Sequence, residues 1–293
     1  MIDDRSARWS PGGTNILRDN GQVPRLRSSE WLVIVYFVYV AVLAGFYFPP
    51  AKAWIFAGVV ATVVIVLARS KSVLRDIFPM AFALAAYREM DWFTPTSRDN
   101  HLERVWIGWD RRLLDSVHLR AAIESAGPVL PSLLEVSYML VYAVAAVSVA
   151  IVFLNHRRAS INRFWVAYLA GTLAAYALFP FFLSEPPRII FPRFDLPHVV
   201  TIFRTFNLWI LGGYAIHSSV FPSAHVSSTF SAAWGLAASI PDRPRFAIGM
   251  ATYGVLVAIA TVYGRYHYAA DAAAGMGVSL VAIVALAVNR RLE

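Results

Sequence analysis

The chain has 293 residues, of which 58% are hydrophobic and only 15% charged. About a quarter of the residues of an average soluble domain are charged, so this composition excludes an ordinary soluble domain and predicts an integral membrane protein. Several apolar runs approach or exceed the roughly 18–20 residues that cross a bilayer as a helix. No alternation typical of a membrane barrel is present. The chain contains no cysteine, which excludes disulfides and thiolate chemistry.

The net charge of +8 comes almost entirely from arginine, because Lys52 and Lys71 are the only lysines. Most arginines stand between apolar runs, where they meet lipid phosphates and set topology. We therefore interpret most of them as interfacial anchors, and we expect no nucleic-acid partner.

The first 68 residues divide into two parts. Residues 1–30 are polar and basic and predict a disordered N-terminal tail. Residues 31–68 predict a transmembrane hairpin, because Pro49 and Pro50 end one apolar run and a second run follows them. We assign residues 69–293 to one catalytic membrane domain.

The next two segments are harder to assign. Residues 73–87 contain Pro79 and a short uncharged centre, so they either cross the membrane with snorkelling ends or lie at its surface. Residues 90–132 alternate apolar and charged positions at helical spacing and predict one or two amphipathic interfacial helices. We expect Asp110 and Asp115 in these helices to be solvated.

Apolar runs predict five further spans, at residues 133–154, 164–183, 223–240, 246–263 and 269–288. A long loop rich in Pro, Arg and aromatic residues is expected over residues 184–220, and loops of this length are usually functional or disordered. The predicted fold is an all-α, polytopic membrane helix bundle of about eight transmembrane helices. A six-helix core follows the N-terminal hairpin.

The basic loops predict the orientation of this bundle. With eight spans, the basic tail and the short basic loops share one side, which the positive-inside rule makes cytoplasmic together with both termini. The loop at 184–220 and the turn at 265–271 then lie on the extracytoplasmic side, and we expect the plasma membrane. With seven spans, both would lie in the cytoplasm.

Two short stretches near the C-terminal end contain the chemistry. In the first, Pro222 suits a helix start, Ser223 suits an N-cap, and the exposed N–H groups favour an anion. His225 lies one turn inside, where it can donate a proton to a leaving oxygen.

In the second stretch, His267 and Asp271 are four residues apart and can touch on one helical face. A carboxylate bonded to one imidazole nitrogen leaves the other free to attack or to accept a proton. Arg265 can clamp phosphate oxygens.

A third stretch ends at Arg188, whose direction is fixed by Pro186 and Pro187. Together the three stretches suit an in-line phosphoryl transfer in which guanidinium and N–H groups take up the charge. A histidine nucleophile would form a covalent phospho-enzyme, and this chemistry requires no metal and no other cofactor. Taken singly, each stretch is also explained by an ordinary helix cap, a self-satisfied His–Asp pair or a membrane-edge arginine.

Other polar residues could contact a lipid head group or a small polyol acceptor, or could serve packing or solvation alone. They are Glu135, Tyr138, Glu185, Asp195, His198, Asn207 and His217. The alternative function is a multi-span lipid or solute transporter without catalysis. That function predicts charges in the middle of the spans and paired broken helices, and the spans hold almost no charges.

The three stretches resemble the signatures of the type 2 phosphatidic acid phosphatase superfamily. Residues 222–225 resemble its second signature, residues 265–271 its third, and residues 187–188 the arginine part of its first, over about residues 133–288. The resemblance implies action on a lipid phosphate, with His267 as nucleophile, Asp271 as its orienting partner and His225 as general acid. The resemblance also implies phosphate binding by Arg188, Ser223 and Arg265.

Three positions depart from these signatures. Phe181 replaces the lysine of the first signature, Ala224 replaces a glycine, and Thr261 replaces an arginine. These departures resemble the branch that includes fungal inositol-phosphorylceramide synthase. That branch transfers a phospho-head group to an alcohol such as inositol instead of water, so hydrolysis and transfer both stay open here.

Overall fold

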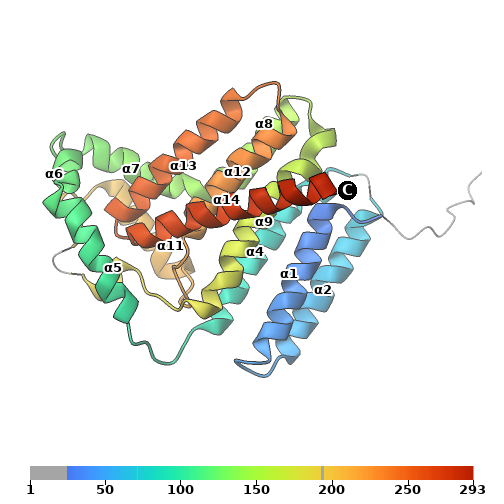
Figure 1. Ribbon diagram of the computed structural model, residues 1–293, viewed down its shortest axis with the longest axis horizontal. Helices are drawn as coiled ribbons and strands as arrows, with labels where there is room; N and C mark the ends of the chain where they lie inside the picture. Colours follow the sequence, from blue (N-terminus) through green and yellow to red (C-terminus); the bar gives the residue numbers. More distant parts are fainter. Residues whose placement is uncertain (1–24, 71, 193–194, 293) are drawn as a thin grey trace, which may run out of the picture.

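The computed structural model describes residues 25–70, 72–192 and 195–292, and this part of the chain is all-α (Figure 1). The predicted tail falls mostly on residues 1–24, which lie outside the described residues; its last three residues belong to the first helix. The N-terminal elements are α1 (Ser28–Ala44), α2 (Ala51–Ala68), α3 (Val73–Ile77), α4 (Pro79–Glu89) and the 3-10 turn η1 (Met90–Phe93). Figure 1 shows α1 and α2 side by side at one edge of the bundle.

The segment from α3 to η1 connects the two ends of the bundle. Pro79 starts α4 and separates it from α3. Near the start of the segment, the Asp76 carboxylate binds Arg27 and Arg158. At its end, the Asp91 carboxylate accepts a hydrogen bond from the His217 backbone. The segment therefore runs the length of the bundle, although neither of its helices is long enough to span a membrane alone.

The stretch after η1 forms amphipathic helices, as predicted. These are α5 (His101–Arg111), the π-helical turn η2 (Arg112–Ser116) and α6 (Leu119–Glu124). The expectation that Asp110 is solvated was wrong. Asp110 is fully buried, because the Arg265 guanidinium and the Ala269 N–H satisfy its two oxygens. Asp115 is about half exposed and pairs with Arg120.

The remaining helices form the apolar bundle. They are α7 (Val129–Leu140), η3 (Val141–Ala143), α8 (Val144–Leu154), η4 (Arg158–Ser160), α9 (Ile161–Leu178), η5 (Phe179–Phe181), α12 (Ala224–Ser239), α13 (Arg245–Tyr263) and α14 (Ala269–Leu292). Among the described residues, five helical stretches are long and apolar enough to cross a membrane: Ala51–Ala68, Val129–Leu154, Arg158–Phe181, Arg245–Tyr263 and Ala269–Val288. The chain is thus a polytopic helical membrane protein. The predicted eight spans are not confirmed, because α1 and α12 are shorter than a full span.

Helix α12 lies at the centre of this bundle, where it packs against α9, α13 and α14. Its predicted cap is confirmed, since the Ser223 hydroxyl accepts a hydrogen bond from the Val226 N–H. Close approach of α9 depends on Gly235, where an added Cβ would lie 2.7 Å from the Phe164 ring.

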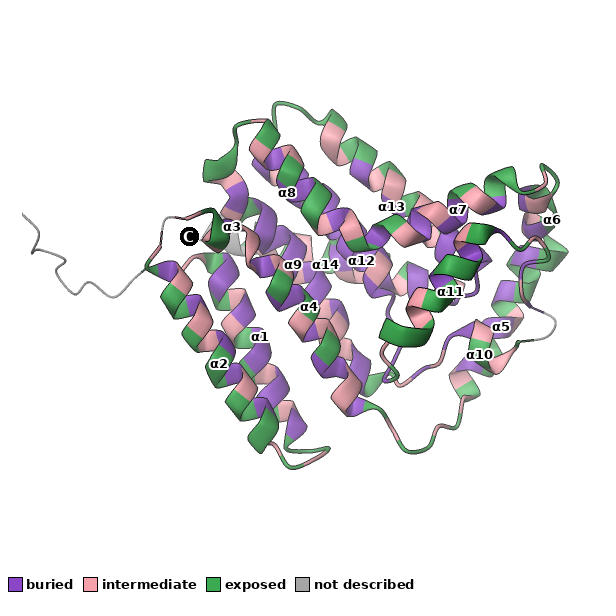
Figure 2. Cartoon of the chain, turned by 180° about the vertical axis from the view of Figure 1, so that it is seen from behind, coloured by how far each residue is buried: buried purple, intermediate pink, exposed green. Residues whose placement is uncertain are grey.

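The segment expected to be a long loop contains two helices. They are α10 (Pro187–Ile190) and α11 (Ile202–Tyr214). The Thr201 side chain caps α11 by accepting a hydrogen bond from the Arg204 N–H. Helix α11 buries Arg204 and Asn207, whereas Ile202 and Trp209 are exposed. Figure 2 shows large exposed areas on this helix. The helix does not stand out as a span because it has only 13 residues and contains Arg204.

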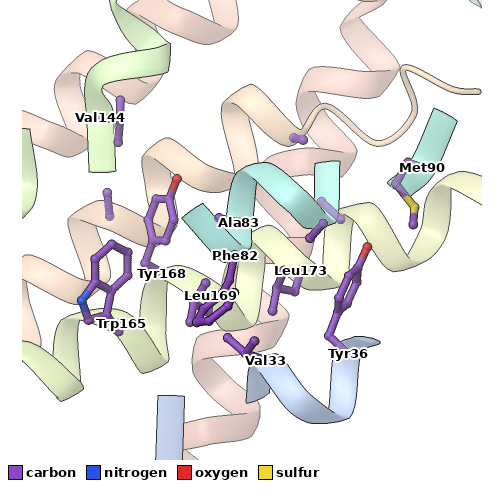
Figure 3. Close-up of a cluster of buried hydrophobic side chains, with 14 of the residues drawn as sticks. Val33, Tyr36, Phe82, Ala83, Met90, Val144, Trp165, Tyr168, Leu169 and Leu173 are labelled. Atoms are coloured by element: carbon purple, nitrogen blue, oxygen red, sulfur yellow. The ribbon is translucent and has the colours of Figure 1, made fainter. Parts of the chain in front are cut away.

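An apolar core and a set of ion pairs hold α1, α3 and α4 against the rest of the bundle. The apolar core joins α1, α4 and α9, with Tyr36, Phe82 and Leu169 among the side chains between them (Figure 3). Beside this core, ion pairs join helix ends and short loops. Arg75 binds Glu30, and Arg157 binds Asp242. The basic loops therefore share one end of the molecule, which we call the basic face.

Candidate active site

The turn between α13 and α14, residues 264–268, presents His267. Arg265 takes a left-handed conformation with φ of 62°, which is costly for a residue other than glycine. The Asp110 carboxylate compensates by binding its guanidinium at 2.7 Å. The His267 N–H bonds to the Thr261 carbonyl at 3.1 Å, which closes the turn back onto α13. We call residues 264–268 the histidine turn.

The predicted contact between His267 and Asp271 is present. The His267 Nδ1 lies 3.3 Å from Asp271 Oδ2, which also accepts the Tyr268 N–H at 2.9 Å. Asp271 is fully buried, so its carboxylate stands behind the imidazole and not in the open site. This arrangement fixes the ring and leaves its second nitrogen for chemistry.

His225 faces His267 from the first turn of α12. The two ring centroids are 5.6 Å apart, with the ring planes at 85°. Tyr138 from α7 places its hydroxyl oxygen 3.4 Å from His225 Nε2, and Tyr142 packs edge-on against the same ring. The two imidazoles thus come together from α12 and from the histidine turn, as the predicted site requires.

Arg188 supplies positive charge beside the imidazoles. Its guanidinium carbon lies 5.6 Å from the centroid of the Tyr266 ring. Among the described residues, no carboxylate pairs with this guanidinium and no hydrogen bond holds it. The Arg188 N–H donates to the Arg265 carbonyl, which fixes α10 against the histidine turn. An unpaired guanidinium at this position is suited to bind an anion.

These side chains open onto a cavity of about 480 Å³. His225, His267, Arg188, Tyr138 and Tyr266 are among its lining residues. Apolar and small residues of α11 and the segment just after it also line the cavity: Leu208, Leu211, Gly212, Ala215 and Ile216. The cavity therefore combines groups suited to a phosphate with a surface suited to an apolar chain.

A second polar group lines the same cavity. Arg98, in the loop before α5, lies with its Nε 3.9 Å from a Glu185 carboxylate oxygen and also donates to the His217 carbonyl. Its Nη1 is buried without a hydrogen-bond partner among the described residues. This pair offers donors and an acceptor side by side, which suits hydroxyl groups.

Several predicted contacts lie outside the cavity. The Arg265 guanidinium is fully buried against Asp110, and Ser223 is buried at the cap of α12. Glu135 and Asn207 bind each other inside the bundle. Asp195 pairs with Arg111 and His198 with Glu124. The local N-cap accounts for Ser223, whereas partners far away in the sequence hold the other groups away from the cavity.

Burial, with the nearby charge of Arg188, lowers the pKa of His267 to about 3. The imidazole is therefore neutral at physiological pH. A neutral ring nitrogen is the form that can attack phosphorus.

Sequence reasoning missed Arg98, Arg204 and Tyr266. Arg98 lies in a polar stretch with no motif spacing. Arg204 lies in the segment expected to be a loop, and Tyr266 lies next to His267 with no spacing signal of its own.

A comparison with protein-family models matches residues 106–285 to the PAP2 superfamily. The chain belongs to this superfamily. The match begins at α5, earlier than the expected start near residue 133, and includes both histidines, Arg188 and Asp110. PAP2 membership implies phosphatase-type phosphoryl transfer on phosphate esters. Neither curated proteins nor solved structures gave a match.

Proposed function

We propose that the protein is an integral membrane enzyme that transfers a phosphoryl group or phospho-head group from a lipid through a phosphohistidine intermediate. One observation supports this most strongly: His267, backed by Asp271, shares a cavity with His225 and an unpaired Arg188. The apolar wall from α11 favours a lipid as the donor.

In the first step, the free nitrogen of His267 attacks phosphorus and the bond to the leaving oxygen breaks. His225 enters this step protonated, donates that proton to the leaving oxygen and becomes neutral, and Arg188 binds the phosphoryl oxygens as their charge grows. In the second step, His225 accepts a proton from water or an alcohol. The resulting nucleophile attacks phosphorus, the P–N bond breaks, and neutral His267 is restored.

The acceptor decides between hydrolysis and transfer. Glu185 and His217 line the cavity with Arg98, and we assign this polar end to the head group or to a small polyol such as inositol. Tyr138 lies at the phosphate end instead. The resemblance to inositol-phosphorylceramide synthases motivates the transfer reaction. The match to the family model supports membership of the PAP2 superfamily and does not distinguish transfer from hydrolysis.

The basic face supports an orientation with both termini in the cytoplasm and the cavity on the extracytoplasmic side of the plasma membrane. Arg75 in the short helix α3 and Arg157 in the loop after α8 lie at that face, where the positive-inside rule applies.

The test is a panel of lipid phosphates on purified protein in detergent, with and without inositol, following free phosphate and transferred product together. We expect one of the two products in the wild type and neither in His267→Ala. His101→Ala is the control, because that imidazole is exposed and binds only Asp99. Equal turnover in wild type and His267→Ala would reject the proposal.

A further inference from the structure

Glu135 is a buried carboxylate that lies behind the cavity and not in it. Only 2% of its surface is exposed. Its Oε1 accepts from Arg204 Nη1 at 3.0 Å, and its Oε2 accepts from Asn207 Nδ2 at 2.7 Å and from the Tyr266 hydroxyl at 2.6 Å. Helices α7 and α11 and the histidine turn thus converge on one side chain.

Such a cluster is seldom retained for stability alone. Burying a carboxylate and a guanidinium costs several kcal/mol of desolvation, and apolar replacements are often at least as stable. The cluster of Glu135, Arg204, Asn207 and Tyr266 provides a fixed geometry instead, because each of these side chains keeps its hydrogen bonds to Glu135 in only one position. Arg204 adds a bond to the Gly264 carbonyl at 3.0 Å, which fixes the start of the histidine turn.

The Tyr266 ring carries this geometry to the site. It stacks on Tyr138 with a centroid separation of 3.9 Å and an interplanar angle of 15°. The Arg188 guanidinium lies against Tyr266, and the Tyr138 hydroxyl reaches His225. One aromatic ring therefore supports both the anion-binding arginine and the contact partner of the second histidine.

We propose that Glu135 is a positioning residue: by holding the Tyr266 hydroxyl, it sets the ring on which Arg188 and Tyr138 rest, and so places Arg188 and His225 against His267. The inference rests on the proposed phosphoryl transfer. It also ties α11, the apolar wall of the cavity, to the histidine turn through Arg204 and Asn207.

Two variants test this role. Tyr266→Phe keeps the ring and removes the bond to Glu135, while Glu135→Gln keeps the shape and removes the charge. We expect kcat to fall roughly 10- to 100-fold in both, since small misplacements of catalytic groups have effects of this size. Tyr263→Phe is the matched control, because that hydroxyl binds Glu124 and not the site. Asp195→Asn is the control for a buried carboxylate paired with an arginine.

The pH profile separates positioning from a general loss of structure. Arg188, His225 and Asp271 are the titratable or charged groups that face His267. The Arg188 charge lowers the pKa of His267, so moving Arg188 away raises that pKa. The acid limb of kcat/KM should then shift to higher pH in Tyr266→Phe and Glu135→Gln, and stay in place in Tyr263→Phe. Loss of folded protein alone would reduce the amplitude without moving the limb.

Folded Tyr266→Phe with wild-type kcat and an unmoved acid limb would overturn the inference. If Glu135→Gln fails to fold, Tyr266→Phe alone decides. If the wild type itself shows no turnover, the proposed function is wrong. The positioning role is then tested by measuring the pKa of His267 by NMR. This pKa should be higher in Tyr266→Phe than in the wild type, and an unchanged pKa would contradict the positioning role.

Discussion

Arg188 brings an unpaired guanidinium to within reach of two imidazoles, at a site where charge develops during phosphoryl transfer. Removing a preorganised charge partner of this kind typically costs 10²–10³ in rate. We predict that Arg188→Ala lowers kcat/KM for a lipid phosphate by about this factor, and that Arg188→Lys recovers only part of it because lysine cannot clamp two oxygens. Steady-state kinetics with Arg104→Ala, an exposed arginine in α5, as the control measures this. A loss within threefold (roughly 0.6 kcal/mol) would exclude Arg188 from the site.

At the same scale, the sequence predicted which residues meet when the partners are close together in the chain. The contact of His267 with Asp271 joins residues four apart, as predicted, although His267 lies in the turn before α14 and not in a helix. The partner of Arg265 does not, because Asp110 lies 155 positions away and only the tertiary fold brings a guanidinium and a carboxylate into one dry space. The phosphate-binding role of Arg265 stays a prediction, and its guanidinium is fully buried and paired with Asp110.

At the scale of single elements, α11 forms the apolar wall of the cavity. A Cβ added at Gly212 or at Gly213 would meet no atom within 4 Å. Gly212 lines the cavity, whereas Gly213 does not. We predict that Gly212→Leu raises KM for a long-chain lipid phosphate several-fold and changes turnover of a short, water-soluble phosphate ester much less. Gly213→Leu should leave both unchanged, and kinetics on the two substrates tests this. Equal effects of the two variants on KM would contradict a contact between α11 and the lipid chain.

The crossing of α12 and α14 depends on Gly275. An added Cβ there would lie 2.3 Å from the Ser223 carbonyl oxygen, a backbone atom that cannot turn aside. We predict that Gly275→Ala lowers the free energy of unfolding by about 1–3 kcal/mol. Gly277→Ala, in open space on the same helix, should be neutral or slightly stabilising. Thermal unfolding in detergent compares them, and matching melting temperatures would contradict the packing described here.

The long apolar runs predicted the long apolar helices, and the predicted ends differ from the observed ends by a few residues. No long apolar run marks helix α11, because it has only 13 residues and contains Arg204 and Asn207. The number of spans also could not be fixed. Helices α1 and α12 have 17 and 16 residues, so each is slightly shorter than a full span.

On the scale of the whole molecule, ion pairs gather the basic loops at one end, and the cavity opens toward the other. The absence of cysteine makes this arrangement easy to test. We predict that a membrane-impermeant thiol reagent added to intact cells labels Ser97→Cys, in the exposed loop near the cavity, and does not label Ala159→Cys at the basic face until the cells are broken. The reverse labelling would place the site in the cytoplasm, as a seven-span topology requires.

The most direct test of the whole account is to trap the covalent intermediate. Purified protein is mixed with a lipid labelled in its phosphate, quenched within one turnover, and analysed for acid-labile, base-stable label on the chain. We predict label on His267 in the wild type and in His101→Ala, and none in His267→Gln. Turnover without any labelled histidine, or label that persists in folded His267→Gln, would contradict a phosphohistidine at this site.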